Sequence, residues 1–180
     1  MKLNAGGVLA LIDNFVELSN VAKGNRELVP AFGVFLTLAP AYNQKSILYS
    51  LEIIFANYKS TSDTLKVNST YSRLHHMNFP QVYFSPLLRF YLSHKKPNFF
   101  IEPGISVSNW INGKVETESF ANGVPQGSST KSYSSQFQMS VLAGFGVEFN
   151  RVSIQARYCT NISGNTDLNY FGIVAKISVF

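Results

Sequence analysis

Two adjacent histidines and a nearby serine are the residues of this sequence whose types could support catalysis. His75 and His76 follow Ser72, and a hydroxyl, an imidazole and an orienting acid together form the nucleophilic arrangement of many hydrolases. No acid is clearly placed to orient either ring, and neighbouring residues of a strand point to opposite faces, which makes the pair a poor metal chelate. We interpret both as surface histidines close to a loop.

Other motifs that carry chemistry are not found. The sequence has no Gly-rich phosphate loop ending in Lys-Ser or Lys-Thr and no zinc-type ligand spacing. Its single cysteine, Cys159, cannot form an intrachain disulfide. The net charge of +5 comes from scattered Lys and Arg residues without a basic stripe. We therefore predict a protein that is not an enzyme, with no cofactor, no metal and no nucleic-acid partner.

A second group of ionisable residues lies inside segments that alternate apolar and polar side chains. Its members share the polar face: Glu52, Arg89, Glu102, Glu148, Arg157 and Lys176. Arg89 and Glu102 are equidistant from the centre of a turn at Lys95 and Lys96, so a simple hairpin predicts a cross-strand ion pair. Inside a narrow barrel such groups need each other, because an unpaired buried charge is costly. We interpret the group as a lumen charge network that fills the interior, in preference to a transport or proton path.

The elements that must position this network are strands. Period-two alternation, which is typical of sheets, occurs near residues 3–11, 30–40, 46–56, 81–92, 99–108, 136–148, 152–159 and 170–179. The connections alternate between short ones, at 41–45, 94–97 and 149–151, and long ones, at 13–29, 58–74, 112–135 and 161–167. This rhythm predicts one all-β domain over residues 1–180, an eight-stranded antiparallel up-and-down transmembrane β-barrel with short periplasmic turns and long extracellular loops.

The apolar face of these strands is predicted to contact lipid in a bacterial outer membrane. It carries large aliphatic and aromatic groups and almost no charge: Leu51, Ile53, Phe84, Leu88, Ile101, Ile105, Val141, Ile154 and Ile173. No run of about 18 apolar residues exists, which excludes a transmembrane helix. Aromatic residues near the strand ends predict two interfacial girdles, towards the short turns (Tyr42, Tyr91, Phe99, Phe149, Phe180) and towards the long loops (Phe15, Tyr58, Tyr71, Phe79, Trp110, Phe137, Tyr170).

The beginning of the chain has two interpretations. Lys2 followed by the apolar stretch from Ala5 to Ile12 is similar to the start of a secretory signal, but the stretch is short and Asp13 ends it. We favour a first strand instead, because single-chain bacterial barrels normally have an even number of strands. An export signal would then precede Met1.

Several short runs resemble the PorT-type outer-membrane β-barrels of Bacteroidetes. They are the strand at 47–58, Ser85-Pro86-Leu87-Leu88-Arg89-Phe90-Tyr91, Phe100-Ile101-Glu102-Pro103-Gly104, and Gly144-Phe145-Gly146-Val147-Glu148 followed by 152–158 and a terminal Phe180. The resemblance implies a barrel fold, and some family members assist type IX protein secretion. The family more often has Gly before Pro where this chain has Pro103 before Gly104. Pro86 and Pro103 each lack the backbone N–H that would donate a hydrogen bond to the neighbouring strand. We therefore expect a bulge or irregular pairing near them.

Three functional hypotheses remain open from the sequence. The first is a non-enzymatic outer-membrane barrel with a closed lumen, whose partners are outer-membrane lipids and other envelope or secretion proteins. The second is a soluble, lipocalin-like barrel that carries an apolar ligand. The third is a lipid-modifying barrel enzyme that uses Ser72 with His75 or His76.

Overall fold

The computed structural model describes residues 2–18, 22–23, 27–39, 47–62, 65–67, 70–93, 96–163 and 166–179. Eight strands form one closed antiparallel barrel. They are β1 (Lys2–Leu18), β3 (Glu27–Ala39), β4 (Ile47–Thr61), β6 (Tyr71–Tyr91), β7 (Asn98–Trp110), β10 (Phe137–Phe149), β11 (Val152–Asn161) and β12 (Thr166–Ser178). The predicted eight-stranded architecture is confirmed, and so is the first strand. Within the described ranges, no helix is long and apolar enough to cross a membrane.

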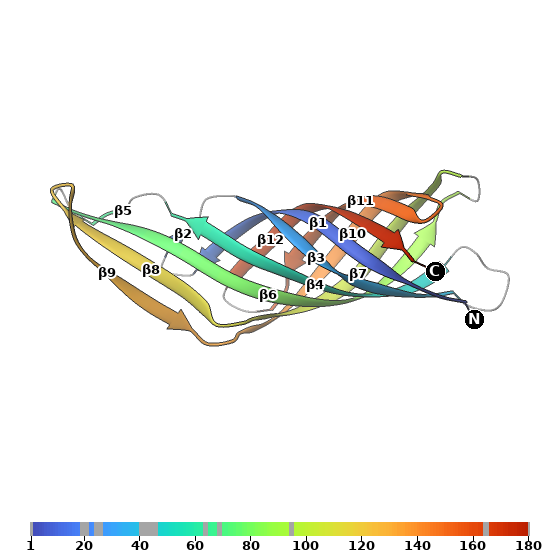
Figure 1. Ribbon diagram of the computed structural model, residues 1–180, viewed down its shortest axis with the longest axis horizontal. Coiled ribbons are helices and arrows are strands. Elements are labelled where there is room, and N and C mark those ends of the chain that lie inside the picture. Colours follow the sequence, from blue (N-terminus) through green and yellow to red (C-terminus); the bar gives the residue numbers. More distant parts are fainter. Residues whose placement is uncertain are drawn as a thin grey trace.

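Each barrel strand pairs with the next one in the order of the chain; β4, for example, pairs with β6, with Ile53 opposite Phe84. One further ladder closes the ring, since β12 pairs with β1, with Leu9 opposite Ala175. Both termini and the β6–β7 and β10–β11 connections lie at one end of the barrel (Figure 1). We call it the short-turn end. The predicted short connection at 41–45, His94 and Phe180 lie outside the described residues.

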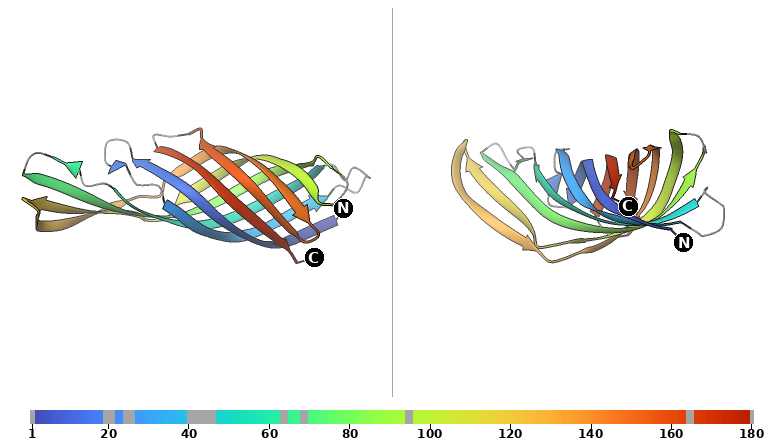
Figure 2. Two further views of the ribbon diagram at one scale, coloured as in Figure 1. Left: turned by 90° about the horizontal axis from the view of Figure 1, so that it is seen from above. Right: turned by 45° about the vertical axis from the view of Figure 1, so that its right-hand side comes forward.

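The opposite end carries a sheet that continues beyond the barrel wall, and the segment 112–135, predicted as a solvated loop, is a β-hairpin there. β6 is 21 residues long, and its first half pairs with β8 (Gly113–Ala121), which pairs with β9 (Val124–Tyr133). Two short strands, β2 (Ala22–Lys23) and β5 (Leu65–Lys66), pair with β1 and β6. We call the first half of β6 with β8 and β9 the sheet extension. It curves away from the barrel in Figure 2.

A two-residue turn explains why the segment 112–135 is a hairpin and not a solvated loop. Asn122 and Gly123 both have positive φ, 51° and 77°. This is the type I′ geometry that matches the twist of flanking strands, and Asn-Gly is the dipeptide that favours it. The turn signal is therefore present in the sequence. Almost all of β9 is exposed, so its sequence does not alternate between apolar and polar residues. Without that alternation the segment was predicted as a loop.

The two faces of the barrel wall differ in composition. Along β10 the side chains alternate between exposed and buried, and the exposed ones include Phe137, Val141, Phe145 and Phe149. The 13 residues of this strand correspond to roughly 40 Å of strand, or about 30 Å along the barrel axis at a usual tilt. This is enough to cover the apolar thickness of an outer membrane, about 25 Å.

The two strand prolines interrupt pairing without a bulge. Between β6 and β7 the ladder skips from Phe84 opposite Val107 to Leu87 opposite Gly104, and then to Phe90 opposite Ile101. The register is the same on both sides of each interruption, so no residue is inserted. The expected irregular pairing is present, and the expected bulge is not.

Candidate functional site

The centre of the barrel holds an ion-pair network around Arg157 of β11. Its guanidinium donates from Nη1 and Nη2 to the two carboxylate oxygens of Glu52 at 2.7 and 3.0 Å, and from Nη2 to Glu102 Oε2 at 3.3 Å. Lys176 Nζ donates to Glu102 Oε2 at 2.7 Å and also contacts Glu52. Glu52 and Glu102 have no exposed surface. Two carboxylates and two cations thus neutralise each other in the lumen.

Arg157 can reach across the lumen because glycines flank it on both neighbouring strands. Gly144 of β10 and Gly172 of β12 are its direct partners in the sheet. A Cβ atom on Gly144 would lie 2.5 Å from Gln155 Oε1. Gly144 is also opposite Glu102, and the space left by its missing side chain is occupied by the Gln155 amide.

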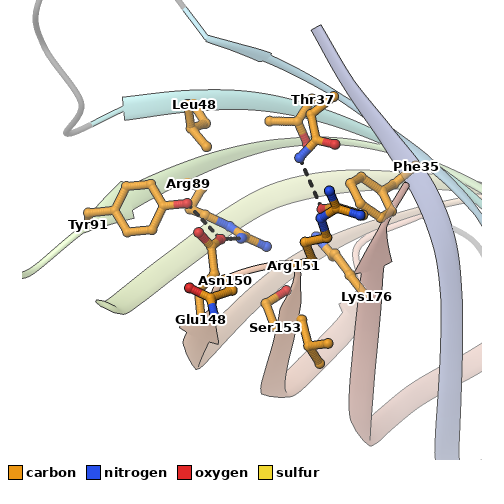
Figure 3. Close-up of a pocket in the computed structure, with 13 residues that line it drawn as sticks. Phe35, Thr37, Leu48, Arg89, Tyr91, Glu148, Asn150, Arg151, Ser153 and Lys176 are labelled. Carbon is orange, nitrogen blue, oxygen red and sulfur yellow. Dashed lines mark hydrogen bonds and ion pairs between the residues drawn. The ribbon is translucent and has the colours of Figure 1, made fainter. Parts of the chain in front are cut away.

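A second part of the network lies at the short-turn end. Arg89 Nε donates to Glu102 Oε1 at 2.9 Å, and Arg89 Nη1 donates to Glu148 Oε2 at 2.6 Å. The Tyr91 hydroxyl donates to the same Glu148 oxygen at 2.7 Å, and the Arg89 guanidinium lies 3.9 Å from the centre of the Phe100 ring. Figure 3 shows Arg89, Tyr91 and Glu148 beside a small polar cavity of about 90 Å³, which Lys176 also lines. The turn at 95–96 predicts that Arg89 lies opposite Glu102, and their hydrogen bond agrees with this register.

A neutral polar layer follows toward the sheet extension. Gln81 Nε2 donates to Ser108 Oγ at 2.7 Å and to Gln138 Oε1 at 3.3 Å. The Tyr83 hydroxyl donates to Gln81 Oε1 at 2.8 Å and also contacts the Tyr58 hydroxyl. These side chains are buried. They occupy this part of the lumen with polar groups that are hydrogen-bonded to each other.

Aromatic rings close the lumen where the sheet extension begins. The Phe79 ring is 4.7 Å from the Trp110 ring and 6.0 Å from the Tyr133 ring. The girdle prediction is wrong for Tyr58, Phe79, Trp110 and Tyr170, which are 1–6% exposed and point into the barrel. Sequence reasoning missed this plug because aromatic residues near a strand end suit both an interface and a lumen. The available signal was the parity of each ring with a polar residue of its own strand: Tyr58 with Glu52, Phe79 with Gln81, Trp110 with Ser108 and Tyr170 with Lys176.

The two histidines do not form a catalytic arrangement with Ser72. His75 is buried, contrary to expectation, and its Nδ1 lies 2.9 Å from Thr117 Oγ1. Burial, and then the charge of Arg73, lower the pKa of His75. His76 does have a neighbouring acid, since its Nε2 lies 3.6 Å from Glu118 Oε1. Ser72 shares the strand face of His76 but lies four residues away, about 13 Å along an extended chain, which is too far for a hydrogen bond.

The outer wall carries the apolar residues singled out in the sequence. Eight are 38–54% exposed: Ile53, Phe84, Leu88, Ile101, Ile105, Val141, Ile154 and Ile173. Leu51 is partly exposed. The apolar groups thus point outward while the six ionisable ones point inward. A lumen of ion pairs and amides is unsuited to an apolar ligand, which disfavours the lipocalin-like hypothesis.

No family model matches this sequence. No curated protein matches it either. Among solved structures, the chain is similar to Ail, the attachment invasion locus protein of Yersinia pestis, with a TM-score of 0.55 and 11% identity over 99% of both chains. Ail in complex with the heparin analogue sucrose octasulfate matches with a TM-score of 0.52, 10% identity and the same coverage. The Neisserial surface protein A (NspA) has a TM-score of 0.46 and 12% identity, over 97% of this chain and 96% of that one.

These likenesses concern the fold, since identity is low. The chain has the fold of small eight-stranded outer-membrane β-barrels. That fold is consistent with a location in the bacterial outer membrane.

Proposed function

We propose that this protein is a non-enzymatic β-barrel of the bacterial outer membrane that presents its sheet extension to a partner. The observation that carries the proposal is the inverted distribution of side chains. The outer wall is apolar, whereas Glu52, Glu102 and Arg157 are fully buried in the lumen. A soluble barrel would instead bury its large apolar groups and expose its charges.

The orientation follows from the two different ends. Outer-membrane barrels have short periplasmic turns and longer extracellular segments, so the short-turn end and both termini face the periplasm. The sheet extension then projects outside the cell. The barrel acts as an anchor, because its lumen is filled by the ion-pair network, the amide layer and the aromatic plug.

The edge of the sheet extension is suited to main-chain recognition. β9 pairs with β8 on one side, and within the described residues no strand pairs with its other side. Nine of its ten residues are exposed. An unpaired strand edge offers amide and carbonyl groups to an extended peptide, which is β-augmentation. We propose an envelope protein as this peptide's source, and the PorT-type resemblance suggests a component of type IX secretion.

Site-specific photocrosslinking in cells tests this partner. A photoreactive residue at Gln126, Ser128 or Thr130 of β9 should crosslink one and the same protein, identified by mass spectrometry. The same residue at Ile105 on the outer wall serves as the control and should crosslink lipid. Equal protein crosslinks from β9 and Ile105 would contradict the proposal. Detergent-free purification as a soluble monomer would contradict the membrane location itself.

A second candidate function is binding of an anionic glycan, as Ail does with sucrose octasulfate. Strand parity places Arg73 and Lys131 on the lumen-side face of the sheet extension with His75 and Thr117. The acids Glu116 and Glu118 fall on the opposite face. In lipid nanodiscs, sucrose octasulfate should bind the protein and bind Arg73→Gln/Lys131→Gln more weakly. Lys96→Gln, at the short-turn end, is the control and should be unchanged.

A further inference from the structure

The barrel wall opens between β3 and β4 towards the sheet extension. The ladder between these strands runs from Leu38 opposite Tyr49 to Ala31 opposite Ala56 and ends there. Both strands nevertheless continue, β3 to Glu27 along β1 and β4 to Thr61 along β6. Beyond Ala31 and Ala56 the two strands no longer pair with each other. Residues 27–30 of β3 and 57–61 of β4 therefore border an opening in the wall.

Two adjoining cavities occupy this opening. The first, of about 540 Å³, is mainly apolar. Its lining includes Leu9, Leu28, Pro30, Phe32 and Phe55. Leu28 and Phe32 are 65% and 60% exposed, and the rings of Phe32 and Phe55 are 5.4 Å apart. On the outer wall these residues offer a surface along which an acyl chain can lie.

The second cavity, of about 340 Å³, is lined mainly by charged and polar residues and adjoins the first, since Glu27 and Lys59 line both. Lys59, Asn78 and Lys114 lie in one row across β4, β6 and β8. Two strand spacings, about 10 Å, separate the lysine backbones, so both long side chains can converge on one anionic group. Glu116 lies in the next row, opposite His76, and also lines this cavity.

We propose that this opening binds a zwitterionic phospholipid with a phosphoethanolamine head group. One acyl chain lies against Leu28, Phe32 and Phe55. The phosphate is bound by Lys59 and Lys114, and the ammonium group by Glu27 and Glu116. Lysines alone would favour any anionic lipid, whereas the carboxylates beside them add attraction for an amine. This site rests on the proposed membrane location, which two other measurements test separately. They are the insertion of the protein into nanodiscs and a heat-dependent shift of the folded barrel in gel electrophoresis.

Native mass spectrometry of the barrel released from nanodiscs tests the head-group specificity. The probes are phosphatidylethanolamine and phosphatidylglycerol with identical acyl chains, supplied in equal amounts. The wild type should retain phosphatidylethanolamine at least about threefold better, as expected for a few partly exposed charge contacts. Lys59→Gln/Lys114→Gln should weaken retention of both lipids, while Glu27→Gln/Glu116→Gln should abolish only the preference.

Matched controls separate this site from general lipid adsorption. Lys96→Gln and Lys131→Gln remove charges elsewhere and should leave retention and preference unchanged. A phosphatidylethanolamine with a photoreactive acyl chain should label Leu28, Phe32 or Phe55 more than Val141 on another part of the wall. Equal retention of the two lipids by the wild type, equal losses in the control variants, or uniform labelling of the wall would each overturn the proposal.

Discussion

Glu102 is the carboxylate on which the interior of the barrel depends most. It accepts hydrogen bonds from Arg89, Arg157 and Lys176 at 2.9, 3.3 and 2.7 Å and has no exposed surface. Glu102→Gln removes the charge and keeps the shape. Breaking a buried ion pair by removing one partner costs about 3–5 kcal/mol. Because each of the three cations retains a second carboxylate, we expect a loss near the lower end, about 3 kcal/mol.

Glu148→Gln provides the matched control for this change. Glu148 also accepts two hydrogen bonds, from Arg89 and Tyr91, but its side chain is 24% exposed at the short-turn end. Water can replace part of what is lost there, so we expect about 1 kcal/mol. The double variant Glu102→Met/Lys176→Met should cost less than the sum of its single changes, because it leaves no unpaired partner of that contact.

Urea unfolding in detergent micelles or liposomes measures these differences. Trp110 is the only tryptophan and is 1% exposed in the lumen, so its fluorescence reports unfolding of the barrel. The free energy of unfolding follows from linear extrapolation to zero urea, and the variants are compared at an unchanged slope against urea concentration. If Glu102→Gln and Glu148→Gln both cost less than about 1 kcal/mol, the network is hydrated and the argument for a sealed, low-dielectric lumen is refuted.

Three other predictions concern the lumen and the wall. The wild type should give negligible single-channel current in planar bilayers, and a steady conductance of porin size would contradict the filled interior. Gly146→Val should cost about 1–3 kcal/mol by urea unfolding, because its Cβ would lie 2.5 Å from the backbone oxygen of Ile154. Gly7→Val, with nothing within 4 Å of its Cβ, is the control, and equal losses would argue against crowding. Val141→Arg on the outer wall should cost about 2–4 kcal/mol in liposomes. Ser128→Arg, on the exposed strand β9 of the sheet extension, should cost less than about 1 kcal/mol, and equal values would contradict a lipid contact.

Local alternation was sufficient to predict most of the barrel wall. Each strand's side-chain period is two, so the sequence around Ile53, Phe84 and Val141 predicted which residues share a face. The hairpin at 95–96 similarly predicted that Arg89 lies opposite Glu102, because register across a short turn is a matter of counting. Where alternation is absent, as in the exposed strand β9, sequence reasoning predicted a loop although the Asn122-Gly123 turn was present.

Contacts across the lumen were decided only by the tertiary structure. Arg157 and Glu52 are 105 residues apart in the sequence, and their meeting depends on how the sheet closes and how far its strands are staggered. The same closure places Gly144 and Gly172 on both sides of Arg157, aims Trp110 and Phe79 into the barrel, and separates β3 from β4 at Ala31. The sequence by itself determined the faces of the strands, because alternation is local. The structure determined which charges, rings and openings meet, because that depends on the curvature and stagger of the whole sheet.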